Sequence, residues 1–369
     1  MLVLALTCAA SLVAIWLVYP LVIGGLALLR RPIIPAQVGS RPSVSVILAT
    51  REEPEAIRRR IDDIRGGDYP SEDLEVIVAF DANGATRLPE LALGDGVRVV
   101  PGDAPGGKAS ALNAGVRSAS GDVLVFTDTA QRFAPDAIAQ LVSALADTRF
   151  SVVSGGLRIG DGTRRSLSER YWLLERWLRR EEARVHSTIG VTGAIYALRR
   201  ECWRPLPPGL ILDDLYVPMR LVLEGRRVGF CDRAVAVDTR RFPPAQEYRR
   251  KVRTLTGVLQ LCAWLPGVLV PVRNPVWLQF VFHKLLRLLT PYLLLVMLLG
   301  ALGALPSLLA RYVPQAATVV LVVLCTVLIV GPWFSRKARH AIVTGFWMQA
   351  AVVQATINGI RGRWDVWSR

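Results

Sequence analysis

The sequence has few residues of the kinds that form disulfide frameworks or bind transition metals. Among 369 residues there are 5 Cys and 3 His, and no two cysteines stand in a C-x-x-C pair. Two of the cysteines, Cys8 and Cys325, lie inside apolar stretches. This pattern argues against a disulfide scaffold or a structural zinc site, and the cysteines are expected to be small buried side chains.

Charged residues are absent from long stretches of the chain. Residues 1–29, 288–310, 312–335 and 341–360 contain no Asp, Glu, Lys or Arg. The rest is strongly basic, because 45 Lys and Arg outnumber 30 Asp and Glu and give a net charge of +15. A bilayer span needs only about 20 apolar residues. With 52% hydrophobic residues, the composition excludes a disordered, collagen-like or coiled-coil chain and also a purely soluble enzyme.

The N-terminal apolar stretch lacks the features of a cleaved signal peptide. No basic residue precedes it, and no small-residue cleavage site stands before Arg30 and Arg31. We interpret residues 2–29 as a retained transmembrane helix. Because basic residues favour the cytoplasmic side of a span, Arg30 and Arg31 are expected in the cytoplasm and the N-terminus outside.

The segment from residue 42 to residue 250 alternates short apolar runs with amphipathic ones. Strands are expected over 43–48, 74–79, 97–100 and 122–127, and helices over 54–65, 108–119 and 166–184. Such alternation is typical of an α/β fold with a doubly wound, mostly parallel sheet. Ligands of these sheets bind at the carboxyl ends of the strands, so Thr50, Asp81 and Asp128 are candidate site residues.

The C-terminal part of the chain is again apolar. Amphipathic segments at 255–270 and 276–288 are interpreted as helices lying in the membrane interface. Two spans over 289–309 and 316–334 follow, and the basic residues after the second place that end in the cytoplasm. Residues 341–360 could cross, but crossing would put a basic tail outside, so a re-entrant or in-plane helix is favoured over a further span. We expect a multi-pass inner-membrane protein that contacts membrane lipids, has a cytoplasmic catalytic domain and binds no nucleic acid.

One hypothesis for the chemistry rests on Gly102-x-x-x-x-Gly107-Lys108, which follows a strand and precedes a helix as a P-loop does. A P-loop needs Ser or Thr after the lysine to hold magnesium, and this chain has Ala109. The acidic strand 122–128 also comes unusually soon. A nucleoside triphosphatase is therefore the minor alternative.

The other hypothesis rests on a set of motifs in a fixed order. The motifs are Val46 to Glu53, Val76 to Asp81, Gly107 to Gly115, Gly121 to Asp128, Thr192 to Arg200, and Leu212-Asp213-Asp214. In order and spacing they resemble the membrane-embedded family-2 glycosyltransferases with a GT-A fold. That group includes cellulose, hyaluronan and poly-N-acetylglucosamine synthases and ceramide glucosyltransferases. The resemblance covers about 43–257, and the flanking helices match the same architecture.

The resemblance implies a binding site for a nucleotide-sugar donor. Asp81 would accept hydrogen bonds from a uracil or ribose, and Thr50 and Glu52 would line the same base pocket. Lys108 would offer a point charge to the diphosphate. A UDP-sugar is therefore the expected donor.

The resemblance also implies the residues of the reaction. Asp128 matches the first acid of a D-x-D site for Mg²⁺ or Mn²⁺, and Asp214 matches the general base that deprotonates the acceptor hydroxyl. Direct attack of that hydroxyl on the anomeric carbon would invert its configuration.

The sequence departs from the family pattern at two of its motifs. The second acid of D-x-D is replaced by Ala130, so a metal would rely on diphosphate oxygens and water, and a metal-independent site stays open. The Q-x-x-R-W motif of processive synthases is Arg250-Lys251-Val252-Arg253-Thr254 here. Loss of its Trp argues against long-chain synthesis, while Arg250 and Arg253 could still hold diphosphate or face anionic lipid.

These expectations define four domains: a transmembrane helix over 1–31, a cytoplasmic GT-A domain over 42–254, interfacial helices over 255–288 and a C-terminal transmembrane region over 289–369. The expected activity is inverting transfer of a sugar from a nucleotide diphosphate to a hydroxyl of a lipid, lipid-linked or glycan acceptor. Polysaccharide elongation is one alternative. A degenerate membrane scaffold that only binds the donor is the other.

Overall fold

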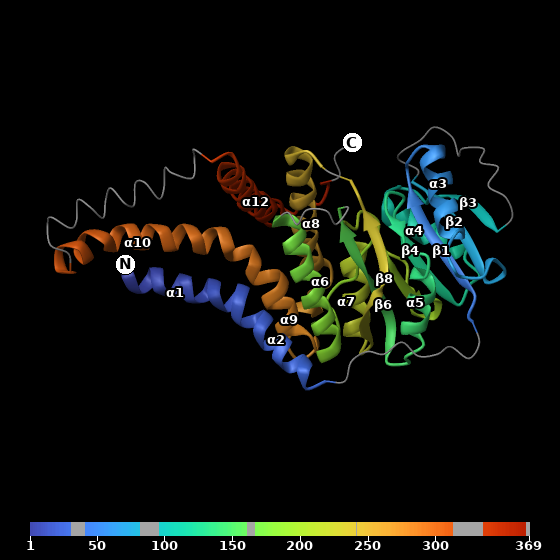
Figure 1. Ribbon diagram of the computed structural model, residues 1–369, viewed down its shortest axis with the longest axis horizontal. Coiled ribbons are helices and arrows are strands. Elements are labelled where there is room, and N and C mark those ends of the chain that lie inside the picture. Colours follow the sequence, from blue (N-terminus) through green and yellow to red (C-terminus); the bar gives the residue numbers. More distant parts are fainter. Residues whose placement is uncertain (31–40, 82–95, 161–166, 241, 313–334, 367–369) are drawn as a thin grey trace. The chain divides into compact units, whose positions relative to one another are not determined.

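The computed structural model describes residues 1–30, 41–81, 96–160, 167–240, 242–312 and 335–366 (Figure 1). The chain forms two compact units. The helical unit comprises Met1–Leu21, Phe242–Leu259 and Val281–Arg369, and the sheet unit comprises Val22–Arg241 and Gln260–Phe280.

A mixed sheet organises the sheet unit, with the strand order β3-β2-β1-β4-β7-β6-β8-β5. Its strands are β1 (Val44–Thr50), β2 (Leu74–Phe80), β3 (Val97–Pro101), β4 (Val123–Thr127), β5 (Arg132–Phe133), β6 (Phe150–Ile159), β7 (Tyr196–Arg199) and β8 (Arg227–Asp238). The four strands expected from sequence are β1 to β4. They pair in parallel, and Val46 of β1 lies opposite Val76 on one side and Val125 on the other.

The other half of the sheet was not anticipated strand by strand. Strand β7 runs antiparallel to both β4 and β6, β5 runs antiparallel to β8, and β6 and β8 are parallel. The expected α/β class with a mostly parallel sheet is thus confirmed, and the antiparallel strands β5 and β7 are additions to it.

Helices cover both faces of the sheet. In the sheet unit they are α3 (Pro54–Arg65), α4 (Lys108–Arg117), α5 (Ala137–Leu145), α6 (Leu167–Val185), α7 (Asp213–Leu223) and α9 (Trp277–Phe280), with 3₁₀ turns at Ser71–Asp73, Arg200–Cys202 and Pro266–Leu269. Helix α3 begins with Pro54 and buries Ile57, Ile61 and Ile64 at helical spacing. Helices α3 and α5 share one core with the strands.

Helix α4 packs closely on the opposite face of the sheet. A Cβ at Gly115 would lie 2.9 Å from Ile47 Cγ2 and 3.2 Å from Ala79 Cβ. Only glycine lets the helix backbone approach β1 and β2 this closely. This packing fixes the start of α4 next to the strand ends.

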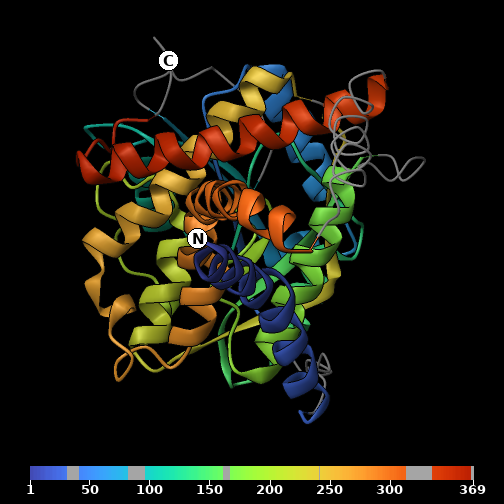
Figure 2. The same ribbon diagram turned by 90° about the vertical axis from the view of Figure 1, so that its left-hand side faces the viewer.

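The helical unit is built from α1 (Leu2–Val13), a π-helical turn (Ala14–Val18), the start of α2 (Tyr19–Leu28), most of α8 (Pro244–Trp264), a π turn (Val281–Leu285), a 3₁₀ turn (Leu286–Leu289), α10 (Thr290–Tyr312) and α12 (Arg336–Ile360). Helices α1 and α10 lie side by side in Figures 1 and 2. Trp16 Nε1 donates a hydrogen bond to Thr290 Oγ1 at 3.1 Å. A Cβ at Gly300 would lie 3.1 Å from Met1 O, so the small residue permits close helix contact.

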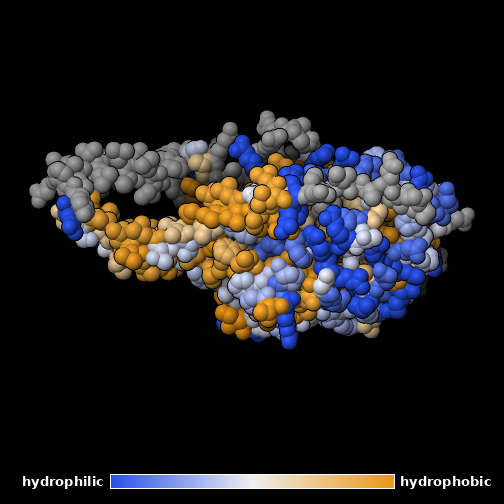
Figure 3. Space-filling model, turned by 90° about the horizontal axis from the view of Figure 1, so that it is seen from below, coloured by the Kyte–Doolittle hydropathy of each residue, from blue (hydrophilic) through white to orange (hydrophobic). Residues whose placement is uncertain are grey.

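Among the described residues, two helical stretches are long and apolar enough to cross a bilayer. They are Leu2–Leu28, with mean hydropathy 2.3, and Trp277–Arg311, with mean hydropathy 2.4. The face of the helices seen in Figure 3 is predominantly hydrophobic, whereas the sheet unit is predominantly hydrophilic on that side. The first stretch matches the expected span 2–29. The expected span 316–334 lies outside the described residues.

Two interfacial segments expected from sequence have different boundaries in the structure. The segment 276–288 is not a separate helix, because the helical path continues from Trp277 to Arg311. Its π and 3₁₀ turns precede Pro291, which cannot donate a backbone hydrogen bond to the preceding turn. The segment 255–270 is also not separate: α8 runs through the expected boundary at 254 and ends at Trp264, before Pro266.

Candidate active site

Three residues predicted from the strand-end rule come together at one edge of the sheet. Thr50 is the last residue of β1, and Asp81 and Asp128 directly follow β2 and β4. Because these strands are parallel neighbours, their carboxyl ends share an edge. The backbone confirms the proximity, since Asp81 N donates to Thr50 O at 2.9 Å.

Asp81 holds the loop that leads into α4. Its Oδ1 accepts a hydrogen bond from Gly107 N at 2.7 Å. Gly107 has φ +90°, a conformation that side chains other than glycine rarely adopt. The conformation of Gly107 therefore brings the backbone next to the Asp81 carboxylate, and α4 begins at the following residue, Lys108.

Lys108 bridges two carboxylates at the centre of the site. Its Nζ lies 3.2 Å from Asp128 Oδ1 and 3.2 Å from Asp213 Oδ1, and its side chain is 25% exposed. Burial alone would lower the pKa of Lys108, but Asp128, Asp213 and Asp214 outweigh burial and hold that pKa above its ordinary value. The ammonium is therefore a fixed positive charge whose contacts in this structure are carboxylates.

Asp214 lies half-buried in the first turn of α7. Its backbone oxygen accepts from Val191 N at 2.8 Å. A Cβ at Gly193 would lie 3.2 Å from Asp214 Oδ2, so the absence of a side chain there leaves room for the carboxylate. Burial and the neighbouring Asp213 raise the pKa of Asp214 to about 6, against the opposing charges of Lys108 and Arg179. Such a carboxyl group is well suited to accept a proton near neutral pH.

The first loop is tied to the loop after β4. Thr50 Oγ1 accepts hydrogen bonds from Glu52 N at 3.0 Å and from the Thr129 hydroxyl at 2.8 Å. Thr129 is the middle residue of Asp128-Thr129-Ala130, so this contact fixes the segment that carries Asp128. The side chain of Glu52 is exposed. Its role in a base pocket stays a prediction.

A buried arginine, Arg60, contacts the last residue of β4 at the strand-end edge of the sheet, and the sequence analysis did not identify it. Arg60 of α3 is fully buried, forms an ion pair with Asp63, and donates from Nη2 to Thr127 Oγ1 at 2.6 Å. The Thr127 hydroxyl in turn donates to Ala194 O at 2.9 Å. Burial lowers the pKa of Arg60 to about 10, partly offset by Asp63. Arg60 thus holds Thr127, the residue before Asp128, and the hydroxyl of Thr127 makes the link to Ala194, the residue after Gly193.

Arg250 and Arg253 lie on α8 in the helical unit. The Arg250 guanidinium lies 4.0 Å from the centre of the Phe242 ring. Their predicted contact with diphosphate stays a prediction.

The expected metal site has one acidic ligand from the D-x-D position. The described residues contain no cluster of three or more His, Cys, Asp or Glu side chains arranged to hold a metal ion. The Asp128 carboxylate is 40% exposed and pairs with Lys108. Oxygen donors of this kind fit Mg²⁺ or Mn²⁺ only when diphosphate and water supply the remaining ligands.

Comparison with known proteins shows which family the sheet unit resembles. Residues 45–203 match the family described as Glycosyl transferase family 2. This segment is therefore similar to family-2 glycosyltransferase domains. Residues 102–108, on which the P-loop interpretation rests, lie inside this match, which favours the glycosyltransferase interpretation over a nucleoside triphosphatase.

Two curated relatives and one solved structure accompany this match. Uncharacterized glycosyltransferases from two strains of Mycobacterium tuberculosis are each 33% identical over 109 residues, which is 29% of this chain. The match covers only 41% of those relatives. The mannosyltransferase PcManGT from Pyrobaculum calidifontis, solved in complex with GDP-Man and Mn²⁺, aligns over 98% of this chain and 99% of its own, with 22% identity and a TM-score of 0.69. That similarity bears on the fold, and it supports the GT-A assignment.

Proposed function

We propose that this protein transfers a sugar from a nucleotide-diphosphate donor to a hydroxyl group of a membrane-presented acceptor, with Asp214 as the general base. The observation that carries the proposal is the position of Asp214. The pKa of its carboxyl group is raised to about 6 by burial and by the neighbouring Asp213. Lys108 pairs with both Asp213 and Asp128 and so connects this part of α7 to the end of β4. These residues lie at the edge of the sheet where the parallel strands end, and Lys108 and Asp128 fall within the segment that matches family 2.

The proposed reaction is a direct displacement. The acceptor oxygen forms a bond to the anomeric carbon, the bond from that carbon to the diphosphate oxygen breaks, and Asp214 takes the proton of the acceptor hydroxyl. One such displacement inverts the anomeric configuration. A general base of this type typically contributes about 100-fold or more to turnover.

Donor binding is assigned to the loops at the ends of β1 and β2. Asp81 and Thr50 would contact the base and ribose, with Glu52 beside them, and Lys108 would turn from its carboxylates to the diphosphate. Bound Mg²⁺ or Mn²⁺, held by Asp128, would supply positive charge to the leaving diphosphate. Arg250 and Arg253 are the proposed further diphosphate contacts. A UDP-sugar is the proposed donor, and the GDP-Man bound to PcManGT makes a GDP-sugar the alternative.

The two apolar helices support a membrane location. With Leu2–Leu28 and Trp277–Arg311 spanning an inner membrane, the basic Arg30-Arg31 pair would place the sheet unit in the cytoplasm, where nucleotide sugars are made available. The acceptor would then be a lipid or lipid-linked molecule in the cytoplasmic leaflet.

Transfer by the purified full-length protein tests the proposal. The protein in detergent micelles is incubated with radiolabelled UDP-sugars or GDP-mannose and a bacterial lipid extract, and label in the lipid fraction is counted. We expect transfer by the wild type, loss of about 100-fold or more in Asp214→Asn, and wild-type transfer by Asp62→Asn, a matched change of an exposed carboxylate on α3. Equal transfer by wild type and Asp214→Asn would remove the base assignment.

A second candidate function is a scaffold that binds the donor without transferring sugar. Ala130 in place of an acid and the pairing of Asp128 with Lys108 favour it. Binding of UDP without donor hydrolysis or transfer under any acceptor condition would support the scaffold.

A further inference from the structure

The sheet unit contains a buried hydroxyl group that makes no hydrogen bond to any described residue. It belongs to Tyr196, the first residue of β7, whose side chain is 0% exposed. A polar group that is buried without a partner destabilises a folded protein, so native structures contain few of them. The hydroxyl of Tyr196 is therefore a candidate for a role in the reaction.

The ring of Tyr196 is fixed by aromatic stacking. Tyr196 lies opposite Phe126 of β4, and the two rings stack with 4.6 Å between their centres. Phe126 also stacks on Trp203, with 5.2 Å between the ring centres. The position of the hydroxyl therefore follows from the pairing of the two strands and from the stacked rings.

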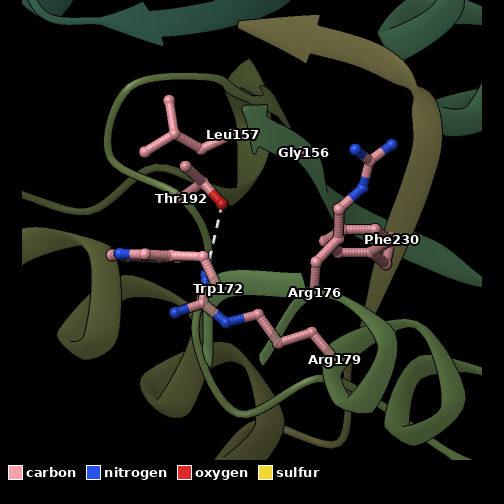
Figure 4. Close-up of a pocket in the computed structure, with 7 residues that line it drawn as sticks. All are labelled: Gly156, Leu157, Trp172, Arg176, Arg179, Thr192 and Phe230. Carbon is pink, nitrogen blue, oxygen red and sulfur yellow. Dashed lines mark hydrogen bonds between the residues drawn. The ribbon is translucent and has the colours of Figure 1, made fainter. Parts of the chain in front are cut away.

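The backbone that leads into β7 is also fixed. The Thr192 hydroxyl accepts a hydrogen bond from Arg179 Nη1 at 3.2 Å (Figure 4). Ile195 N donates to Thr192 O at 2.8 Å, and Ala194 O accepts from the Thr127 hydroxyl at 2.9 Å. A loose backbone is therefore not the reason that the hydroxyl of the next residue lacks a partner.

The hydroxyl of Tyr196 lies near the acidic cluster of the candidate site. Tyr196 comes three residues after Gly193, which borders Asp214 Oδ2. Burial raises the pKa of the Tyr196 hydroxyl well above its ordinary value. The negative charges of Asp213, Asp214 and Asp128 raise that pKa further. The hydroxyl therefore keeps its proton near neutral pH and can donate a hydrogen bond to a carboxylate.

Asp213 depends on Lys108 more than Asp128 does. The Asp213 side chain is 8% exposed, against 40% for Asp128, and its Oδ1 lies 3.2 Å from Lys108 Nζ. In the described part of the chain Lys108 is the only ion-pair partner of Asp213. When Lys108 turns to the diphosphate of the donor, water can reach Asp128. Asp213 would be left as a buried carboxylate without a compensating charge, which is strongly unfavourable.

We propose that the Tyr196 hydroxyl donates a hydrogen bond to Asp213 when Lys108 turns to the diphosphate of the bound donor, which makes Tyr196 a positioning residue for donor binding. This inference rests on the proposed function and deepens it, since it assigns a replacement partner to the carboxylate that the lysine leaves. The Asp213 side chain, released by the ammonium group, turns to the hydroxyl. No covalent bond changes, because the tyrosine keeps its proton.

The variant Tyr196→Phe tests the inference, because it removes the hydroxyl and keeps the stacked ring. Full-length protein in maltoside micelles is titrated calorimetrically with UDP and with GDP in the presence of Mg²⁺, and its melting temperature is measured without nucleotide. We expect Tyr196→Phe to bind the nucleoside diphosphate roughly tenfold or more weakly than the wild type, because the buried carboxylate loses its donor. Its melting temperature should equal or exceed that of the wild type, because the hydroxyl has no partner in the free protein.

A second buried tyrosine of the sheet unit provides the control. The Tyr69 hydroxyl donates to Pro42 O at 2.6 Å. Tyr69→Phe should therefore melt at a lower temperature than the wild type and bind the nucleotide with unchanged affinity. If Tyr196→Phe melts as low as Tyr69→Phe, its hydroxyl already has a partner in the free protein, and the inference is overturned.

A double-mutant cycle tests whether Tyr196 acts through Asp213. Asp213→Asn removes the charge that needs the hydroxyl donor, so adding Tyr196→Phe to this variant should leave the nucleotide affinity unchanged. An equal loss of affinity on adding Tyr196→Phe to the wild type and to Asp213→Asn would overturn the inference, because the hydroxyl would then act without the carboxylate.

The titrations also separate this inference from the proposed function. If the wild type binds UDP or GDP and Tyr196→Phe binds it equally well, the role of Tyr196 is wrong while the proposed function stands. If the wild type binds neither nucleotide, the proposed function fails and the role of Tyr196 fails with it.

Discussion

Asp81 Oδ1 accepts a hydrogen bond from Gly107 N at 2.7 Å and thereby joins the end of β2 to the loop that starts α4. The two residues are far apart in sequence, and the contact places the proposed base-binding carboxylate next to the lysine of the site. The proposed donor pocket is therefore linked to the charged cluster through the Gly107 loop.

The first prediction concerns this link. Asp81→Ala should lower the affinity for UDP roughly tenfold or more, because both the direct contact and the support of the Gly107 loop are lost. Asp81→Asn keeps an acceptor oxygen for Gly107 N and should lose less. Calorimetric titration with UDP and GDP measures both variants. Unchanged affinity in Asp81→Ala would show that the base pocket lies elsewhere, and tighter binding of GDP would change the donor class.

The second prediction concerns the pH dependence of transfer. Because the pKa of Asp214 is raised to about 6, the carboxylate form needed for proton abstraction is lost as pH falls through that value. Turnover under saturating substrates should therefore rise between about pH 5 and pH 7 with a midpoint near 6. The residual activity of Asp214→Asn should not follow this curve. A midpoint shared by wild type and Asp214→Asn would assign the titration to another group.

The third prediction concerns Arg60. Its removal would leave Asp63 and Thr127 without their buried partner, so Arg60→Gln should lower the free energy of unfolding by about 3 kcal/mol. Arg59→Gln, which changes an exposed neighbour, should stay within about 0.5 kcal/mol of wild type. Denaturant unfolding of the full-length protein in micelles, followed by tryptophan fluorescence, measures both. Similar losses in the two variants would argue against a special role for Arg60.

The fourth prediction concerns stability in acid. Burial alone would raise the pKa of the Glu75 carboxyl, but hydrogen bonds from Ser45, Ser120 and Arg98 outweigh burial and lower that pKa from 4.5 to about 2. A depressed pKa means that ionised Glu75 stabilises the fold above about pH 4.5, and that this contribution is lost as pH falls toward 2.

The variant Glu75→Gln isolates this contribution. At neutral pH the wild type should melt at a higher temperature than Glu75→Gln, and the difference should shrink steadily below about pH 4.5. A difference in melting temperature that does not change between neutral pH and pH 3 would contradict the assignment, because it would reflect packing rather than charge.

Much of the fold was predictable because its first half follows simple patterns. Strands β1 to β4 are nearly continuous apolar runs, and α3 has its proline at the start and isoleucines on one face. The later strands are harder to recognise because β6 contains Gly155 and Gly156 and β7 has only four residues. Their pairing depends on contacts between distant parts of the chain.

The proximity of the candidate site residues was predictable wherever a residue stands at the end of a parallel strand. Thr50, Asp81 and Asp128 follow from that rule, whereas the bridge from Lys108 to Asp213 depends on how the starts of α4 and α7 meet. Arg60 was missed for a different reason. It stands among Arg58 and Arg59 in an amphipathic helix, where a charged residue normally faces water, and only the packing shows that it is buried.

The last prediction concerns topology, on which the proposed mechanism depends because nucleotide sugars are cytoplasmic. Single cysteines are introduced into a variant whose native cysteines are replaced, and intact cells are treated with a membrane-impermeant maleimide. Arg58→Cys in the sheet unit should react only after lysis, whereas Arg311→Cys at the end of the second apolar helix should react in intact cells. Asp365→Cys, just after α12, should be protected if residues 341–360 lie in the plane or re-enter, and should react if they cross. Labelling of Arg58→Cys from outside would overturn the assignment of a cytoplasmic nucleotide sugar as donor, whatever the result at position 365.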